Sequence, residues 1–217
     1  MKIIAIFAFC NADKELVKGV KENLSWVDDF VIHDDTKRTE PFNEYKIRHS
    51  MKERAIKKGA DWILELDPDE RFEKNAEIIF RAVTYNKAKV RYRVNFRELY
   101  TPDSYRVDGS WKLKHRISLY PVYPDQKMKN KHFNVKTWPV GKDYKTIALD
   151  VNLYHLKHIE PENRAERVRW LKQQDPNNKT QKKGYNYLLN ENHIELEKIP
   201  KGREYIPKYE RWEYHAD

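Results

Sequence analysis

The chain has 217 residues, of which 39% are hydrophobic and 13% aromatic; this length and composition fit one domain with a sizeable core and exclude wholesale disorder. The 43 Lys and Arg outnumber the 34 Asp and Glu, and the net charge of +9 fits either a polyanionic partner or a solvated lysine-rich surface. Because Cys10 is the single cysteine and no apolar run approaches about 18 residues, we expect no intrachain disulfide, no membrane span and a cytoplasmic location.

The first part of the chain alternates apolar runs with helical patterns. Residues 2–9 form a continuous apolar run, typical of a strand covered on both faces. Further strands are predicted at 30–32 and 60–66, and helices at 13–24 and 41–58. This β-α-β-α-β order predicts an α/β fold, with a mostly parallel sheet and helices on both faces.

The second part is predicted to hold a helix at 73–85, strands at 89–96, 117–120 and 147–153, and a helix at 161–172. After Pro176 the chain is polar and lysine-rich. We therefore expect one domain over 1–175, with one half at 1–85 and another at 86–175. Residues 176–217 are expected to form a C-terminal extension.

Acidic side chains follow the third predicted strand. This strand ends in Asp67, Asp69 and Glu70, and Asp35 follows the second strand. Ligands of such sheets bind beyond the carboxyl ends of the strands, where carboxylates and substrate phosphates can hold Mg²⁺ or Mn²⁺. An Asp-x-Asp tripeptide alone is more simply an acidic turn that opens a helix. Its place after the third strand favours a metal site that grips a diphosphate.

The motifs, taken in their order along the chain, resemble those of the family 2 glycosyltransferases, which have the GT-A fold. The resemblance covers residues 1 to about 175, and it implies that 1–85 are the nucleotide-sugar half and 86–175 the acceptor half. It rests on the end of the first strand at Cys10, on 23–36, on Arg48 with His49, and on 59–70, 111–120 and 153–164.

The resemblance implies a nucleotide pocket. Asp35 matches the position that contacts the base, commonly uracil, and Arg48 matches a helix arginine that lines the same pocket. Ala8 and Cys10 match the edge of the first strand, where the nucleotide packs. The expected donor is therefore a nucleotide diphosphate sugar, with a UDP-sugar favoured.

The resemblance also implies a metal site. Asp67 matches the acid near the ribose and the metal, and Asp69 matches a direct metal ligand. His155, after the last predicted strand, matches a histidine that completes the site, and imidazole is a suitable ligand for Mn²⁺. A histidine satisfied at the edge of the sheet is the simpler alternative.

The catalytic base is where the resemblance weakens. Residues 132–134 read His-Phe-Asn where some relatives carry His-Glu. Asp108, next to Gly109, is a candidate base because glycine allows an acceptor to approach closely; a turn aspartate is the alternative. Glu70 is a second candidate catalytic carboxylate. Inversion and retention of configuration both stay open.

Basic and aromatic residues interleave in the predicted acceptor half. Such a surface can hold a phosphate backbone and stack bases or sugars, or it can be the solvated face of an ordinary strand. It makes a modified base of phage DNA or a bacterial glycan an acceptor to test. The residues are Arg91, Tyr92, Arg93, Phe96, Arg97, Tyr100, Tyr105, Arg106, Trp111, Lys112, Lys114, His115 and Arg116.

The sequence thus predicts a metal-dependent enzyme that moves a sugar from a nucleotide diphosphate sugar to a hydroxyl group. One alternative is a non-catalytic module of the same fold that binds nucleic acid or glycan. Another is a nucleotidyltransferase, although such enzymes usually carry a glycine-rich basic loop early in the chain, which residues 8–20 lack. The sugar, the acceptor and the oligomeric state stay open.

Overall fold

The computed structural model describes residues 1–39, 42–85, 89–123, 135, 137–139 and 143–213. Within these residues, nine strands and four α-helices follow one another, with short 3₁₀ helices at Asn11–Asp13, Gly109–Trp111 and Asn186–Leu189. The elements are β1 (Ile3–Phe9), α1 (Leu16–Asn23), β2 (Asp29–Asp34), α2 (Glu44–Lys57), β3 (Trp62–Glu65), β4 (Glu70–Phe72), α3 (Ala76–Thr84), β5 (Val90–Thr101), β6 (Ser104–Arg106), β7 (Lys114–Pro121), β8 (Lys145–His155), α4 (Pro161–Gln174) and β9 (Leu196–Lys198).

The sheet is mixed. β1 lies between β2 and β3 and is parallel to both, as the β-α-β-α-β pattern predicts. β7 then pairs antiparallel with β3 and with β5, and β5 pairs in parallel with β8. The predicted α/β class, with a Rossmann-like first part and a mixed second part, is confirmed.

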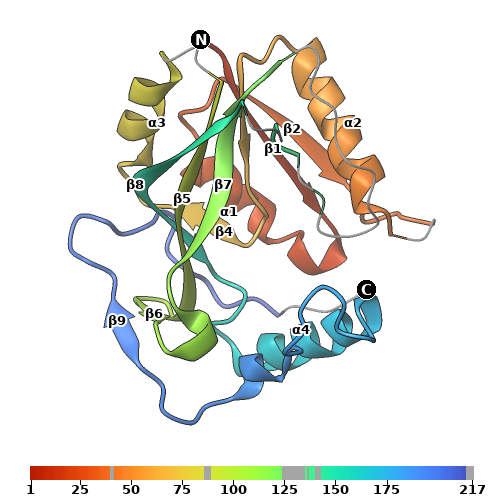
Figure 1. The fold of residues 1–217 in the computed structure, drawn as a ribbon, viewed down its shortest axis with the longest axis vertical. Coiled ribbons are helices and arrows are strands. Elements are labelled where there is room, and N and C mark those ends of the chain that lie inside the picture. Colours follow the sequence, from red (N-terminus) through yellow and green to blue (C-terminus); the bar gives the residue numbers. More distant parts are fainter. Residues whose placement is uncertain (40–41, 86–88, 124–134, 136, 140–142, 214–217) are drawn as a thin grey trace.

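Both faces of the sheet are covered, which explains the continuous apolar run of β1. Ile3, Ala5 and Phe7 belong to the core that also includes residues of α1 and α3. Ile4 and Ile6 point to the opposite face and pack with residues of α2. Successive side chains of a strand alternate between faces, so a strand buried on both sides has no polar face. Figure 1 shows α2 and α3 on opposite sides of the sheet.

Two predicted helices begin later than expected. Asp13 does not cap the first helix but lies in the 3₁₀ helix that precedes α1. The second helix begins at Glu44 because Asn43 caps it, with its side chain accepting a hydrogen bond from the Lys46 N–H. Pro41, which was expected to open this helix, lies outside the described residues.

The acidic run contains a strand that the sequence did not predict. Glu70 begins β4, which pairs antiparallel with β8 and places Glu70 opposite His155. Glu70 is therefore a buried strand residue and not a loop carboxylate. This pairing brings the end of β8 beside Asp67-Pro68-Asp69.

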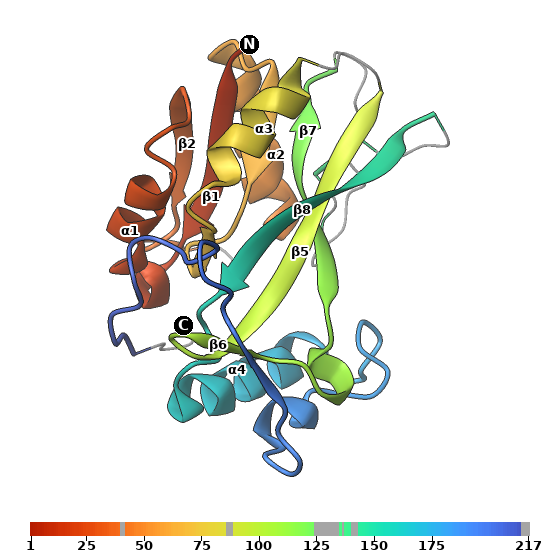
Figure 2. The same cartoon turned by 90° about the vertical axis from the view of Figure 1, so that its left-hand side faces the viewer.

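The C-terminal residues pack along the body of the molecule, as Figure 2 shows. β9 pairs antiparallel with β6, and the indole Nε1 of Trp212 donates a hydrogen bond of 3.0 Å to the carbonyl of Ala12. The extension thereby contacts the segment that follows β1. None of the described helices is long and apolar enough to cross a membrane.

Candidate functional site

A cavity of about 300 Å³ lies beyond the carboxyl ends of β1, β2 and β3. The end of β8 and the helix α4, which lies below this edge of the sheet in Figure 1, also contribute to its wall. The cavity brings together seven of the predicted site residues, which come from five separate segments of the chain. They are Ala8, Cys10, Asp35, Arg48, Asp67, Asp69 and His155.

Backbone contacts hold the acidic loop between β3 and β4. The carbonyl of Asp67 accepts a hydrogen bond from the Glu70 N–H at 3.1 Å, and the carbonyl of Asp69 accepts one from the Leu156 N–H at 2.8 Å. The buried guanidinium of Arg71 donates to the carbonyl of Pro68 at 2.7 Å. The acidic loop and the end of β8 are thus linked directly by a backbone hydrogen bond. The side chains of Asp69 and His155 therefore have fixed relative positions.

Asp67 belongs to an arginine cluster, which we define as Arg48, Arg116, Glu65, Asp67 and Glu70. Arg48 lies 2.6 Å from Glu65 Oε1 and 3.3 Å from Asp67 Oδ1. Arg116 lies 2.9 Å from Asp67 Oδ2 and also bonds Glu70. Burial works to raise the pKa of Asp67, but Arg116 and Arg48 outweigh it and hold that pKa well below its usual range. Both oxygens of Asp67 are therefore engaged by guanidinium groups.

Asp69 belongs to a histidine cluster, which we define as Asp69, Glu98, His155 and Lys157. Asp69 Oδ2 lies 3.1 Å from His155 Nε2 and 3.0 Å from Lys157 Nζ. Burial opposes ionisation of Asp69, yet Lys157 and His155 lower its pKa. Burial likewise works to lower the pKa of His155, but Asp69 and Glu98 on its two sides raise it to about 10.

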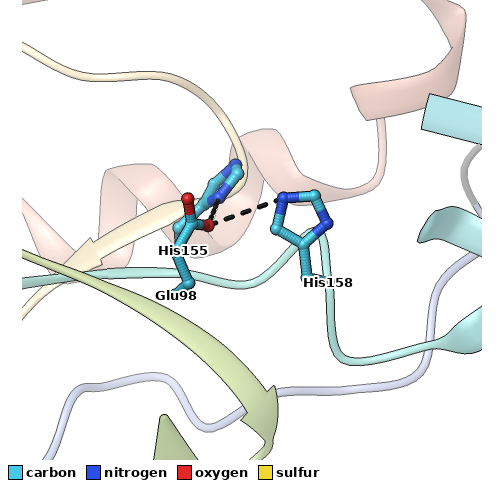
Figure 3. Close-up of side chains that lie close together, drawn as sticks. All are labelled: Glu98, His155 and His158. Atoms are coloured by element: carbon cyan, nitrogen blue, oxygen red, sulfur yellow. Dashed lines mark hydrogen bonds and ion pairs between the residues drawn. The ribbon is translucent and has the colours of Figure 1, made fainter. Parts of the chain in front are cut away.

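The second nitrogen of His155 faces away from Asp69. His155 Nδ1 lies 2.5 Å from Glu98 Oε2, and His158 Nε2 lies 3.5 Å from the same oxygen, as Figure 3 shows. Glu98, His155 and His158 are close enough together to be considered as a metal-binding group. His155 is therefore shared between two arrangements that use opposite ring nitrogens.

The end of the cavity that lies beyond β2 is formed around Asp35. Asp35 Oδ2 accepts a hydrogen bond of 2.8 Å from Arg38, and His33 Nε2 lies 3.7 Å from Asp35 Oδ1. Ala8 and Cys10 line the adjoining edge of β1. Asp35 and Arg48, which the resemblance places in one pocket, thus line the same cavity as Asp69.

The structure does not bring the two predicted catalytic carboxylates to the cavity. Asp108 is held by Arg106, whose Nε and Nη2 lie 2.6 and 2.9 Å from its two oxygens, and it does not line the cavity. Glu70 is only 1% exposed and does not line it either, because its carboxylate bonds Arg116 and the Asp67 N–H inside the sheet. His132 lies outside the described residues.

In the part of the chain that the structure describes, three of the eight basic residues proposed for a nucleic-acid surface pair with carboxylates of the same chain. Arg116 and Lys114 pair with Asp67 and Glu98, and Arg106 is 2% exposed and pairs with Asp108. Charges that are already neutralised by carboxylates are poor phosphate contacts. Neither the fold nor the comparisons below support a DNA acceptor.

Several residues of the site were missed from the sequence, namely Asp13, Glu98, Arg116 and Lys157. Arg116, on β7, was considered only as a basic residue of a possible nucleic-acid surface, and Glu98, on β5, lies beyond the strand predicted at 89–96. Lys157 lies two residues after His155, inside a segment used for the resemblance, so proximity to His155 was an available signal.

No family model and no curated protein matches the sequence. Among solved structures, S. aureus TarS 1–349 aligns over 87% of this chain and 69% of that chain, with 12% identity and a TM-score of 0.46. A glycosyltransferase involved in the glycosylation of the major capsid of PBCV-1 aligns over 54% and 60%, with 14% identity and a TM-score of 0.34. A putative glucose-1-phosphate thymidylyltransferase from Bacillus anthracis aligns over 70% and 88%, with 7% identity and a TM-score of 0.41. These values describe a loose likeness of overall arrangement and assign no activity.

Proposed function

We propose that the protein is a glycosyltransferase that transfers a sugar from a nucleotide diphosphate sugar, with a UDP-sugar as the favoured donor, and that it uses a divalent metal ion. One observation carries the proposal. Asp35, Arg48, Asp69 and His155, which come from four separate parts of the chain, line a single cavity at the carboxyl edge of the sheet. Convergence of this kind is what a ligand site of an open α/β sheet requires.

The donor would lie along the cavity from Asp35 toward Asp69. Asp35 would accept hydrogen bonds from the base, and Ala8 and Cys10 would contact the nucleoside. Arg48 would act mainly through Asp67, because its guanidinium already bonds Glu44, Glu65 and Asp67. Lys157 Nζ, beside Asp69, would contact a phosphate oxygen.

The residues present fit a metal ion best at Asp69 and His155. Asp69 Oδ1 accepts no hydrogen bond from the described residues, and Asp69 Oδ2 lies 3.1 Å from His155 Nε2. Adjacent ligands of an octahedral ion with bonds of about 2.1 Å are about 3 Å apart, so this pair needs little rearrangement. Asp67 fits less well as a ligand, because two arginines occupy its oxygens. When bound, the ion would supply charge neutralisation for the departing diphosphate.

Asp13 replaces Asp108 and Glu70 as the candidate proton acceptor. Asp13 lines the cavity, and its Oδ1 accepts no hydrogen bond from the described residues. Lys157 Nζ lies 3.9 Å away, farther than a hydrogen bond. Burial raises the pKa of Asp13 more than Lys157 lowers it. A carboxylate with a raised pKa in a substrate cavity is suited to general base catalysis.

The experiment is hydrolysis of UDP-sugars without an acceptor, together with thermal stabilisation by UDP, GDP and dTDP with and without Mn²⁺. We expect turnover of one UDP-sugar and stabilisation that needs both the diphosphate and Mn²⁺. Asp69→Ala should remove both effects, and Asp143→Ala, an exposed aspartate, should remove neither.

The same experiment tests the other two functions. Stabilisation by a nucleotide diphosphate without turnover of any donor would favour the binding module. Release of inorganic diphosphate from a nucleoside triphosphate and a sugar phosphate would identify a nucleotidyltransferase. No stabilisation by any nucleotide would contradict the proposal.

A further inference from the structure

Glu98 contacts the face of the histidine cluster that lies away from the cavity. Its side chain is buried, at 6% exposure, and it does not line the cavity. The parallel register of β5 with β8 places Glu98 directly beside His155. His155 thus lies between two carboxylates, with Nε2 toward Asp69 and Nδ1 toward Glu98.

The carboxylate of Glu98 has little freedom to move. Lys114 Nζ donates to Oε1 at 2.8 Å, whereas His155 Nδ1 and His158 Nε2 lie 2.5 and 3.5 Å from Oε2. Glu98 is therefore an acceptor that is held on its two oxygens by groups from β7, from β8 and from the loop after β8.

The distances decide whether Glu98 is itself a metal ligand. A separation of 2.5 Å between His155 Nδ1 and Glu98 Oε2 is that of a direct hydrogen bond. An ion with bonds of about 2.1 Å would need these two atoms about 3 Å apart. The pair on the cavity side, at 3.1 Å, already has this spacing. The geometry therefore separates a ligand pair, Asp69 with His155, from a supporting carboxylate.

We infer that Glu98 is a positioning residue, which keeps the proton of His155 on Nδ1 and thereby presents Nε2 to a metal ion at Asp69. A neutral imidazole carries one N–H, and the hydrogen bond made by one nitrogen determines which nitrogen is left to bind a metal. Lys114 and His158 support this role by holding Glu98 in place. The inference rests on the proposed metal site and adds the residue that orients its histidine.

The first measurement is the affinity of the full-length chain for Mn²⁺, by electron paramagnetic resonance. Loss of a carboxylate that supports a metal-binding histidine typically weakens metal affinity about 10- to 100-fold, and we expect this of Glu98→Ala. Glu98→Gln keeps an oxygen acceptor and should recover most of the affinity. Glu73→Gln is the matched control, since Glu73 is an equally buried carboxylate, at 4% exposure, that bonds Asn152 and Arg203. It should leave the affinity unchanged.

The second measurement needs no metal. In the bare chain, the short bond to Glu98 should give a downfield Nδ1–H proton signal, assigned to His155 by its loss in His155→Gln. We expect Glu98→Ala to remove this signal and Glu73→Gln to keep it. Wild-type protein that lacks the signal would overturn the inference, whether or not a metal binds.

The two measurements separate the failure of the inference from failure of the proposed function. If the signal is present but no Mn²⁺ binds, the metal site fails and the hydrogen bond that fixes His155 stands. If Asp69→Asn leaves Mn²⁺ affinity unchanged while Glu98→Ala abolishes it, Glu98 is a ligand and the inference is wrong.

Discussion

The arginine cluster and the histidine cluster lie at the same edge of the sheet, and both surround a carboxylate of the same loop. Asp67 is held by Arg48 and Arg116, whereas Asp69 is held by His155 and Lys157. The cations differ in one respect that matters for metal binding. Arginine keeps its proton under all ordinary conditions, but histidine can exchange a proton for a metal ion.

This difference assigns the two carboxylates different tasks. Removal of Arg48 or Arg116 would leave the buried carboxyl group of Glu65 or Glu70 without its arginine, so the arginine cluster is suited to hold the loop in shape. Asp69 keeps Oδ1 clear of protein donors among the described residues, and its partner His155 can release a proton. Residues only two positions apart are thus suited to structure and to ligand binding, respectively.

The largest expected effect comes from the histidine cluster. Asp69→Asn removes the charge that a metal ion needs and should lower donor hydrolysis by about 10²- to 10⁴-fold, equivalent to several kcal/mol of transition-state stabilisation. Asp69 is 2% exposed and also pairs with Lys157, so the variant should lose some stability, and urea denaturation should show that it stays folded under the assay conditions. Full activity of Asp69→Asn would show that Asp69 does not bind the metal.

In the arginine cluster the main effect of a substitution should be on stability. Arg116→Met removes the arginine that pairs with both the buried Glu70 and Asp67. We expect a loss of about 3 kcal/mol in the free energy of unfolding. The estimate is at the low end of the range for broken buried pairs because the Asp67 side chain is 39% exposed. Urea denaturation measures it, and Arg169→Met, an exposed arginine on α4, is the control. Equal stability of the two variants would contradict the role of the arginine cluster in holding the loop in shape.

Metal binding by the histidine cluster should depend on pH. Asp69 and Glu98 raise the pKa of His155 to about 10, so below that pH a metal ion must displace the proton on Nε2. Affinity for Mn²⁺ should therefore fall about tenfold for each pH unit from 8 to 6, as expected for competition with one proton. Calorimetric titration in buffers of different ionisation enthalpy measures the proton released. Release of no proton would place the metal elsewhere.

The smallest effect is expected at Asp108. Asp108→Asn weakens its ion pair with Arg106 outside the cavity, so donor hydrolysis should change by no more than about twofold, as for a surface site away from the chemistry. Asp13→Asn should lower transfer to an acceptor far more. Initial rates of sugar transfer by the two variants, compared at one donor concentration, decide which carboxylate acts as the proton acceptor.

The sequence predicted the first half of the fold well because its signals are local. The apolar run of β1 and the acids after β3 can be read from neighbouring residues, and β1, β2 and β3 form the expected parallel sheet. The second half was predicted less well. β5 is longer than the alternating pattern indicated, and β4 was missed because a strand of three residues has no period of its own.

The candidate site divides in the same way. Asp69 and Asp35 were predicted because they follow strands directly, and the carboxyl ends of parallel strands meet at one edge. Asp108 was chosen from a favourable neighbour, Gly109, and the tertiary structure instead pairs it with Arg106. A preference of one residue for a turn contains no information about which side of the sheet the turn reaches.

The sequence by itself thus determined the order of the elements, the carboxylates at the strand ends and the histidine at the end of β8. Only the tertiary structure decided which cation meets which carboxylate. The register of β4 and β5 with β8 sets Glu70 and Glu98 beside His155, and that register pairs residues that are 81 to 85 positions apart for β4 and 55 to 57 positions apart for β5. Strand pairing is non-local, so no local pattern could show that Asp67 is held by arginines and Asp69 by a histidine.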